Sequence, residues 1–144
     1  MQERWDARPR LRRGSAAWSY LAETRCLPPD VLAAAADADV VREGFSGSAW
    51  FAHRHDGSVQ HIEVRGPNFK GSLRGGMKTL FQFGGVGEGS SRLAVTEAPI
   101  DALSLAAIEG VRSDTLYVAT GGGMGAGTVQ AIERLLAAIA SLGV

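Results

Sequence analysis

The chain has 144 residues, of which 45% are hydrophobic and 21% are charged. This balance excludes a disordered or collagen-like chain, and the length allows one ordinary hydrophobic core with a small additional module. No uncharged apolar run approaches the roughly 18 to 20 residues of a membrane-spanning helix, and the Arg-rich start lacks the apolar segment of a secretory signal. We therefore expect a cytoplasmic protein without a membrane partner. Cys26 is the only cysteine, so neither disulfides nor a structural zinc site are expected.

The charges are unevenly distributed, although the formal net charge of the whole chain is zero. Residues 42–78 carry six basic and three acidic side chains, whereas residues 79–144 carry three basic and six acidic ones. A basic segment followed by an acidic one is typical of a surface that contacts a polyanion beside a possible metal site. Ordinary scatter of charges along the chain is the alternative explanation.

The first 40 residues predict a basic arm followed by two short helices. Residues 1–14 contain five arginines and few apolar residues, so we expect a loose arm that contacts nucleic acid or solvent. Ser15 can cap a helix whose apolar residues recur at helical spacing through Ala22. Asp30 can cap a second helix that ends near residue 38. The two helices predict an αα-hairpin.

Antiparallel strands and a basic loop are expected next. Asp56-Gly57 separates two alternating runs rich in β-branched and aromatic residues, which is the strongest short signal for a β-hairpin. Residues 66–78 combine four glycines, a proline and three basic side chains, which predicts a flexible basic loop. A strand over residues 79–83 precedes a Gly/Ser-rich connection. We assign residues 15–88 to a small N-terminal α+β module with a helical hairpin and antiparallel strands.

After residue 88 the pattern changes to strands that alternate with helices. Strands are expected over residues 93–96 and 115–119, and helices over residues 100–109 and 128–142. Such alternation predicts parallel strands joined by right-handed crossovers, so the fold class is α/β. With only two strands, residues 89–144 are expected to form a partial parallel βαβα unit.

Glu97 and Asp101 are the candidate metal ligands. Glu97 directly follows an apolar strand, and ligands of open α/β sheets bind at the carboxyl ends of the strands. Asp101 lies in the first turn of the following helix, where the helix dipole favours an acidic side chain. A purely structural role is therefore the alternative, in which Asp101 stabilises the helix and Glu97 caps it.

Residues 93–105, LAVTEAPIDALSL, resemble the first motif of TOPRIM domains, which occur in DnaG-type primases, in type IA and type II topoisomerases, and in RecR and OLD-type proteins. The upstream segments 69–72 (FKGS) and 78–81 (KTLF) are similar to the basic stretch that precedes TOPRIM in primase-like proteins of plasmids and other mobile elements. There a Tyr-Leu pair and a helical hairpin often open the module, as Tyr20 and Leu21 do here. The resemblance extends from residue 15 to the C-terminus and is closest to the plasmid and mobile-element branch.

This resemblance implies a metal-dependent centre for nucleotidyl transfer or strand cleavage. Glu97 would correspond to the TOPRIM glutamate, as catalytic acid–base group or metal ligand, and Asp101 would support it. Mg²⁺ or Mn²⁺ is the expected cofactor, because Mg²⁺ prefers carboxylate oxygens and keeps waters and substrate phosphates in its shell.

Phosphates are the expected ligands of two further groups of residues. Basic side chains would hold the phosphate backbone or an incoming triphosphate. Backbone N–H groups of the glycine-rich turn at residues 121–127 would meet a phosphate, although a plain flexible turn agrees with this sequence equally well. The turn formally fits a dinucleotide fingerprint, but the ribose-binding acid expected downstream is absent. The candidate residues for nucleic-acid or nucleotide binding are Arg65, Lys70, Arg74, Lys78, Gly121 and Gly122.

The sequence departs from the TOPRIM pattern at two places. Ala98 replaces the glycine that usually follows the motif glutamate, which is a mild change. The family also has a later Asp-x-Asp on a third strand, whereas this sequence ends at Val144 before such a strand. The Asp-x-Asp at residues 37–39 precedes the first motif and is interpreted as a chance match. With one or two carboxylates we expect weak Mg²⁺ binding, and either part of a longer primase-like protein or a member that binds without catalysing.

Histidines and aromatic residues offer further candidates. The three histidines lie at strand spacing, but no fourth zinc ligand is evident, so a structural role is favoured. Trp50, Phe51 and Phe81 are expected in the core, whereas Phe69 is as well suited to stacking on a base. The apolar stripe of the last helix lacks a partner strand and favours a homodimer.

The leading hypothesis is a primase-like TOPRIM protein that binds single-stranded DNA or RNA, nucleoside triphosphates and a divalent metal. Its parent activity would be template-directed nucleotidyl transfer in DNA replication or plasmid mobilisation, with a helicase or other replication or mobilisation proteins as partners. The first alternative is a non-catalytic module that binds nucleic acid or a protein partner. The second alternative is strand cleavage by a TOPRIM nuclease or topoisomerase-like enzyme.

Overall fold

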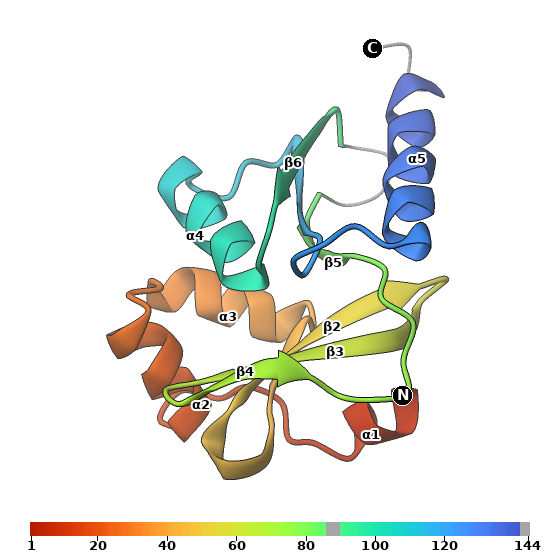
Figure 1. The fold of residues 1–144 in the computed structure, drawn as a ribbon. Helices are drawn as coiled ribbons and strands as arrows, with labels where there is room; N and C mark the ends of the chain where they lie inside the picture. Colours follow the sequence, from red (N-terminus) through yellow and green to blue (C-terminus); the bar gives the residue numbers. More distant parts are fainter. Residues whose placement is uncertain (86–89, 142–144) are drawn as a thin grey trace. The chain divides into compact units, whose positions relative to one another are not determined.

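The computed structural model describes residues 1–85 and 90–141, and its fold is mixed α/β with mostly antiparallel strand pairs (Figure 1). The chain divides into two compact units, Met1–Met77 and Lys78–Val144. The expected boundary lay further along the chain, after residue 88. None of the helices in the described part is both long enough and apolar enough to cross a bilayer.

The first unit combines short helices with four antiparallel strands. Strand β2 pairs with β1 and with β3, and β3 pairs with β4, so β4 lies at the edge of this group. The helical segments are α1 (Gln2–Asp6), α2 (Ala16–Ser19), the π-helical turn η1 (Tyr20–Thr24), α3 (Pro29–Asp37) and the 3₁₀ turn η2 (Phe45–Gly47). The strands are β1 (Val41–Glu43), β2 (Ala49–His55), β3 (Ser58–Gly66) and β4 (Phe69–Ser72).

The predicted hairpin at Asp56-Gly57 is confirmed. These two residues join β2 to β3 and have φ values of 50° and 78°. A two-residue turn with positive φ at both positions has the twist that antiparallel strands need, and Asp-Gly adopts it readily. The turn thus sets the first pairs, His55↔Ser58 and Arg54↔Val59, and the register then shifts between Arg54 and His53.

The helical hairpin is also present, with one cap at a different residue. The Ser15 hydroxyl accepts a hydrogen bond from the Trp18 N–H at 3.2 Å, as predicted for a cap. The second helix begins two residues earlier than expected, because Pro28, and not Asp30, is its N-cap and Pro29 is its first residue. Asp30 is therefore inside the first turn rather than at the cap. A proline is favoured there because its missing N–H has no helical partner anyway.

The N-terminal segment is not a loose arm, which corrects the expectation for residues 1–14. Trp5 lies on α1 and is fully buried against β2 and β3, and Leu11 is 4% exposed. The Glu43 N–H donates to the Pro9 carbonyl at 3.1 Å, so the segment also runs beside β1. The buried Trp5 and Leu11 side chains and this main-chain bond hold the Arg-rich segment against the unit.

Asp39 anchors the arginines around this packed segment. Its carboxylate accepts hydrogen bonds from Arg42 at 2.8 and 2.9 Å and from the Trp5 indole at 3.3 Å. Burial opposes ionisation of Asp39, but the bonds from Arg42 and Trp5 outweigh it, and the pKa of Asp39 lies below its ordinary value. The Asp-x-Asp at residues 37–39 therefore has a structural use here, in agreement with its interpretation as a chance match.

The expected basic loop at residues 66–78 is partly a strand. Residues Phe69–Ser72 form β4, which pairs with β3 from Gly66↔Phe69 to Glu63↔Ser72. Only Pro67 and Asn68 lie between the two paired segments, so the proline and asparagine make a tight turn instead of a flexible loop. Glycine content alone overstated the flexibility of this segment.

The second unit contains the predicted parallel strand pair. Its elements are β5 (Phe81–Gly84), β6 (Arg92–Thr96), α4 (Pro99–Glu109), β7 (Thr115–Ala119) and α5 (Ala126–Ser141). Strands β6 and β7 are parallel, as expected, and β7 also pairs with β5 in the antiparallel sense, which the sequence did not indicate. Leu80, Leu116, Val118 and Ala131 form a core that joins α5 to these strands. Part of the Gly/Ser-rich connection, residues 86–89, lies outside the described residues.

The packing of the N-terminal segment can be tested by truncating Trp5. We expect Trp5→Ala to lower the free energy of unfolding by about 3–5 kcal/mol, the usual cost of removing a buried aromatic side chain. The exposed Arg13→Ala variant is the control and should change it by less than about 0.5 kcal/mol. Urea unfolding measures both. Equal stability of the two variants would mean that the segment does not pack.

Candidate metal and phosphate site

Glu97 stands at the carboxyl end of β6, where the parallel strand pair ends. The Thr96 hydroxyl donates to the Val118 carbonyl at 2.8 Å, and the Thr120 N–H donates to the Thr96 carbonyl at 3.1 Å. These bonds hold the end of β6 against the end of β7. The side chain of Glu97 is exposed just beyond them, as the sequence predicts for a ligand-binding position.

The glycine turn after β7 is bonded directly to Glu97. The N–H groups of Gly121 and Gly122 both donate to the Glu97 carbonyl, at 2.7 and 3.2 Å. The φ values of 76° and 103° at these two residues require glycine. The turn therefore lies next to Glu97, and these two N–H groups, which were expected to meet a phosphate, bind the protein instead.

Lys78 is the basic side chain that the second unit places at this turn. Its ammonium donates to the Gly123 carbonyl at 2.6 Å. The main chain of Lys78 also passes close to Gly127, since a Cβ atom at Gly127 would lie 2.6 Å from the Lys78 carbonyl oxygen. Three segments that are distant in the sequence therefore meet within this unit: Lys78, Glu97 and the glycine turn.

Asp101 has the structural role that the sequence allowed. Its Oδ2 accepts a hydrogen bond from the Ala98 N–H at 3.3 Å, at the start of α4, and Pro99 occupies the first helical position. The side chain is exposed, and within the described residues Oδ1 makes no hydrogen bond. Oδ2 thus stabilises the start of the helix, while Oδ1 has no hydrogen-bond partner among the described residues.

The opposite, amino ends of the same strands have a different electrostatic character. There Arg92 binds Glu109 at 2.7 and 2.9 Å, and the Tyr117 hydroxyl donates to Glu109 at 2.8 Å. Hydrogen bonds from Arg112 and then Thr115 lower the pKa of Asp114 to about 2. These carboxylates are compensated by protein partners, whereas Glu97 has no ion pair within the described residues. At the carboxyl end of β6 and the start of α4, neither Glu97 nor Asp101 has a cationic partner within the described residues.

The donor chemistry at Glu97 suits a hard cation. Glu97 and Asp101 supply carboxylate oxygens, which Mg²⁺ and Mn²⁺ accept, and both side chains are open to solvent. Across residues 1–85 and 90–140, no three His, Cys, Asp or Glu side chains are grouped so that they could hold a metal. A cation bound at Glu97 would therefore take its remaining ligands from water and from phosphate oxygens.

The other predicted phosphate-binding residues lie in the first unit. Arg65 on β3 and Lys70 on β4 are directly opposite each other in the strand pair, so their side chains share one face. Arg74 follows β4, and its carbonyl accepts a hydrogen bond from the Arg4 guanidinium at 2.9 Å. We call Arg65, Lys70 and Arg74 the basic edge. The structure brings Arg65 and Lys70 together, as the nucleic-acid hypothesis needs.

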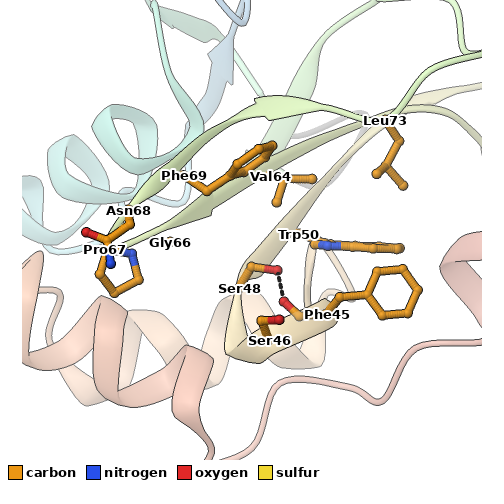
Figure 2. A pocket seen from close by; sticks show the side chains of 10 residues that line it. All are labelled: Phe45, Ser46, Ser48, Trp50, Val64, Gly66, Pro67, Asn68, Phe69 and Leu73. Carbon is orange, nitrogen blue, oxygen red and sulfur yellow. Dashed lines mark hydrogen bonds between the residues drawn. The ribbon is translucent and has the colours of Figure 1, made fainter.

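The first unit also contains an apolar pocket that the sequence did not reveal (Figure 2). Phe45, Trp50 and Phe69 are its aromatic lining residues, and Phe45 and Phe69 are 63% and 58% exposed. Trp50, Phe51 and Phe81 are buried, as predicted. Phe45 does not fit the apolar periodicity of a strand or a helix, so the sequence did not indicate that it lines a pocket. The preceding Gly44 was the only local feature that could have pointed to it.

The histidines contact carboxylates and one another. His55 Nε2 lies 3.1 Å from Asp56 Oδ2. His53 is fully buried, and its Nε2 lies 2.6 Å from Glu63 Oε2. The rings of His53 and His61 meet edge to face with centroids 4.7 Å apart. This arrangement agrees with the structural role that the sequence favoured.

Comparison with known proteins gives one partial match. A family described as a protein of unknown function, DUF3991, matches residues 19–89, which is just under half of the chain. No curated protein and no solved structure matches the chain. The matched segment contains the basic edge and all residues of the apolar pocket, and it ends before Glu97. The resemblance of residues 93–105 to the TOPRIM motif is not tested by these results and stays a prediction.

The geometry of the glycine turn predicts unequal effects of alanine at its positions. Gly122→Ala should destabilise the second unit by about 1–3 kcal/mol because its φ of 103° is strained for any residue with a Cβ. Gly123→Ala is the matched control, since a Cβ there meets nothing within 4 Å. Thermal unfolding of the two variants measures the difference. If both variants melt alike, the bonded turn at Glu97 is not formed in solution.

Proposed function

We propose that this chain is a primase-like TOPRIM protein that binds a divalent cation together with the phosphates of a nucleotide or nucleic acid at Glu97. The observation that carries the proposal is the exposed Glu97 carboxylate, fixed through its own main chain at the carboxyl end of β6, with Lys78 bonded to the adjoining turn. An acid without a cationic partner can bind a cation, and a lysine beside the same turn can bind a phosphate. The bound cation and phosphate would then neutralise each other's charge.

In this proposal each residue has a separate task. Glu97 holds Mg²⁺ or Mn²⁺ with support from Asp101, and the cation, when bound, neutralises charge on the phosphate. Lys78 supplies a compact positive charge to the same phosphate. Gly121 and Gly122 do not contact the ligand but hold Glu97 in place.

The basic edge extends the proposal to single-stranded DNA or RNA. Arg65, Lys70 and Arg74 would contact the phosphate backbone, which attracts basic side chains without regard to sequence. Template-directed nucleotidyl transfer in replication or plasmid mobilisation is the parent activity that we assign to such a protein. A cytoplasmic location, nucleoside triphosphates as substrates, and a helicase or other mobilisation partner belong to the same proposal.

A non-catalytic nucleic-acid-binding module is the second candidate function. The basic edge and the apolar pocket favour it, because both lie in the first unit and neither needs a metal. The two candidates differ in what Glu97 does. Only the first requires that a cation and a nucleotide depend on this carboxylate.

Removing the charge of Glu97 tests the metal site. Mn²⁺ with ATP should raise the melting temperature of the wild-type protein, and a ligand at ten times its dissociation constant stabilises by about 1.4 kcal/mol. We expect Glu97→Gln to lose this shift. Glu133→Gln, which neutralises an exposed carboxylate on α5, should retain it. An unchanged shift in Glu97→Gln would remove Glu97 from the site.

The predicted phosphate contacts can be counted from the dependence of binding on salt. For single strands, each phosphate contact contributes about 0.7 to the slope of log K against log salt concentration. Combining Lys70→Ala with Lys78→Ala should therefore weaken binding and reduce the slope by about 1.4. The control combines Arg25→Ala with Arg134→Ala and removes the same formal charge. Equal slopes in the two double variants would contradict the assignment of Lys70 and Lys78.

A further inference from the structure

The apolar pocket of the first unit is the strongest unassigned feature of the structure (Figure 2). Its volume of about 430 Å³ falls within the range of sites that bind small organic groups. Phe69 and Trp50 lie on opposite sides of Val64, and Phe45 lies beyond Trp50. The pocket thus offers flat aromatic faces to a ligand.

Two glycines make room for two of these rings. The indole of Trp50 occupies the space that a Cβ atom at Gly44 would need. A Cβ at Gly71 would lie 3.1 Å from the Phe69 ring, so this ring lies against the bare main chain of β4. The local sequence thus helps to position both rings: Trp50 is in addition buried in the core of the first unit, whereas Phe69 is exposed.

Arg8, which lies in the N-terminal segment, holds the third ring, that of Phe45, in place. Its guanidinium lies 4.5 Å from the centroid of Phe45 and 5.7 Å from that of Trp50. It also donates to the carbonyls of Glu43 and Gly44 at 3.0 and 2.9 Å. Phe45 is thus held edge to face with Trp50, although most of its surface is exposed to solvent. An exposed aromatic side chain held in this way is preorganised for a ligand.

The charges on the other face of β3 and β4, opposite to Phe69, indicate the class of ligand. From Val64 to Met77 the chain has three basic side chains and no acidic one. Arg65 and Lys70 stand directly opposite each other, and like charges in that arrangement destabilise a strand pair. An anion bound at this edge would relieve the repulsion. The ligand should therefore carry both flat apolar groups and a row of negative charges.

We propose that the pocket binds a base of single-stranded nucleic acid whose phosphates lie along the basic edge. Phe69 projects to the pocket face of β4, and its neighbour Lys70 projects to the other face. Since β4 is the outermost strand of its group, a nucleic-acid strand that crosses this edge places a base on one face and phosphates on the other. This inference rests on the nucleic-acid binding proposed above and adds a base-stacking site that does not involve Glu97.

The test compares two probes of equal length, a short oligothymidylate and an abasic oligonucleotide, by fluorescence anisotropy in the presence of EDTA. EDTA removes the contribution of a metal at Glu97, so the readout reports the contacts that do not depend on a metal. The variant is Phe69→Ala, which changes an exposed ring and should fold normally. Ile108→Ala, at an exposed apolar residue of α4, is the matched control.

We expect Phe69→Ala to lower the affinity for oligothymidylate about tenfold, the scale of losing one base–aromatic stack, and to leave the affinity for the abasic probe unchanged. Ile108→Ala should bind both probes as the wild type does. Wild-type affinity of Phe69→Ala for oligothymidylate would overturn the base site, as would an equal loss for both probes. If the wild-type protein binds neither probe, the proposed nucleic-acid binding of the basic edge fails as well. The Glu97→Gln measurement remains a separate test of the metal site.

Discussion

The candidate metal and phosphate site depends on one acceptor, the main-chain carbonyl of Glu97. It receives the N–H groups of both Gly121 and Gly122, so the loop after β6 and the loop after β7 are locked together just beyond the parallel strands. These main-chain bonds hold Glu97 in place without using its side chain, which is exposed. Lys78 completes the arrangement by bonding to the carbonyl of Gly123. Substitutions at the glycines should therefore affect the site without touching its charged groups.

The two units carry different kinds of recognition chemistry. The second unit has an uncompensated acid and a lysine at one end of its strands, and ion pairs that bind Glu109 and Asp114 at the other end. Because each carboxylate at the amino ends has a cationic partner, that end stabilises the fold and offers little to a ligand. The first unit has no comparable acidic site at its edge strand but combines aromatic rings with basic side chains. A polymer with both phosphates and bases matches this second combination.

Sequence reasoning succeeded where short-range chemistry decides the structure. Asp56-Gly57 predicted its hairpin because the turn itself demands those φ values, and Glu97 was placed correctly because an apolar strand ends beside it. It failed for Trp5, which is buried against β2 and β3, far along the chain, and for β4, whose glycines suggested a loop. The apolar pocket has no periodic signal at all. The pocket becomes evident only in the structure, where the Trp50 ring lies against Gly44 and the Phe69 ring lies against Gly71.

The most direct test of the central claim is to locate the bound cation by NMR. Mn²⁺ broadens amide signals of residues near it, so a titration with Mn²⁺ and ATP maps the site on the protein without any substitution. The account predicts the strongest broadening at Glu97, Gly121 and Lys78, and the weakest within β6 and β7 at Arg92 and Thr115, the first residues of these strands. Broadening confined to the amino ends, or uniform broadening over the second unit, would contradict a cation site at Glu97.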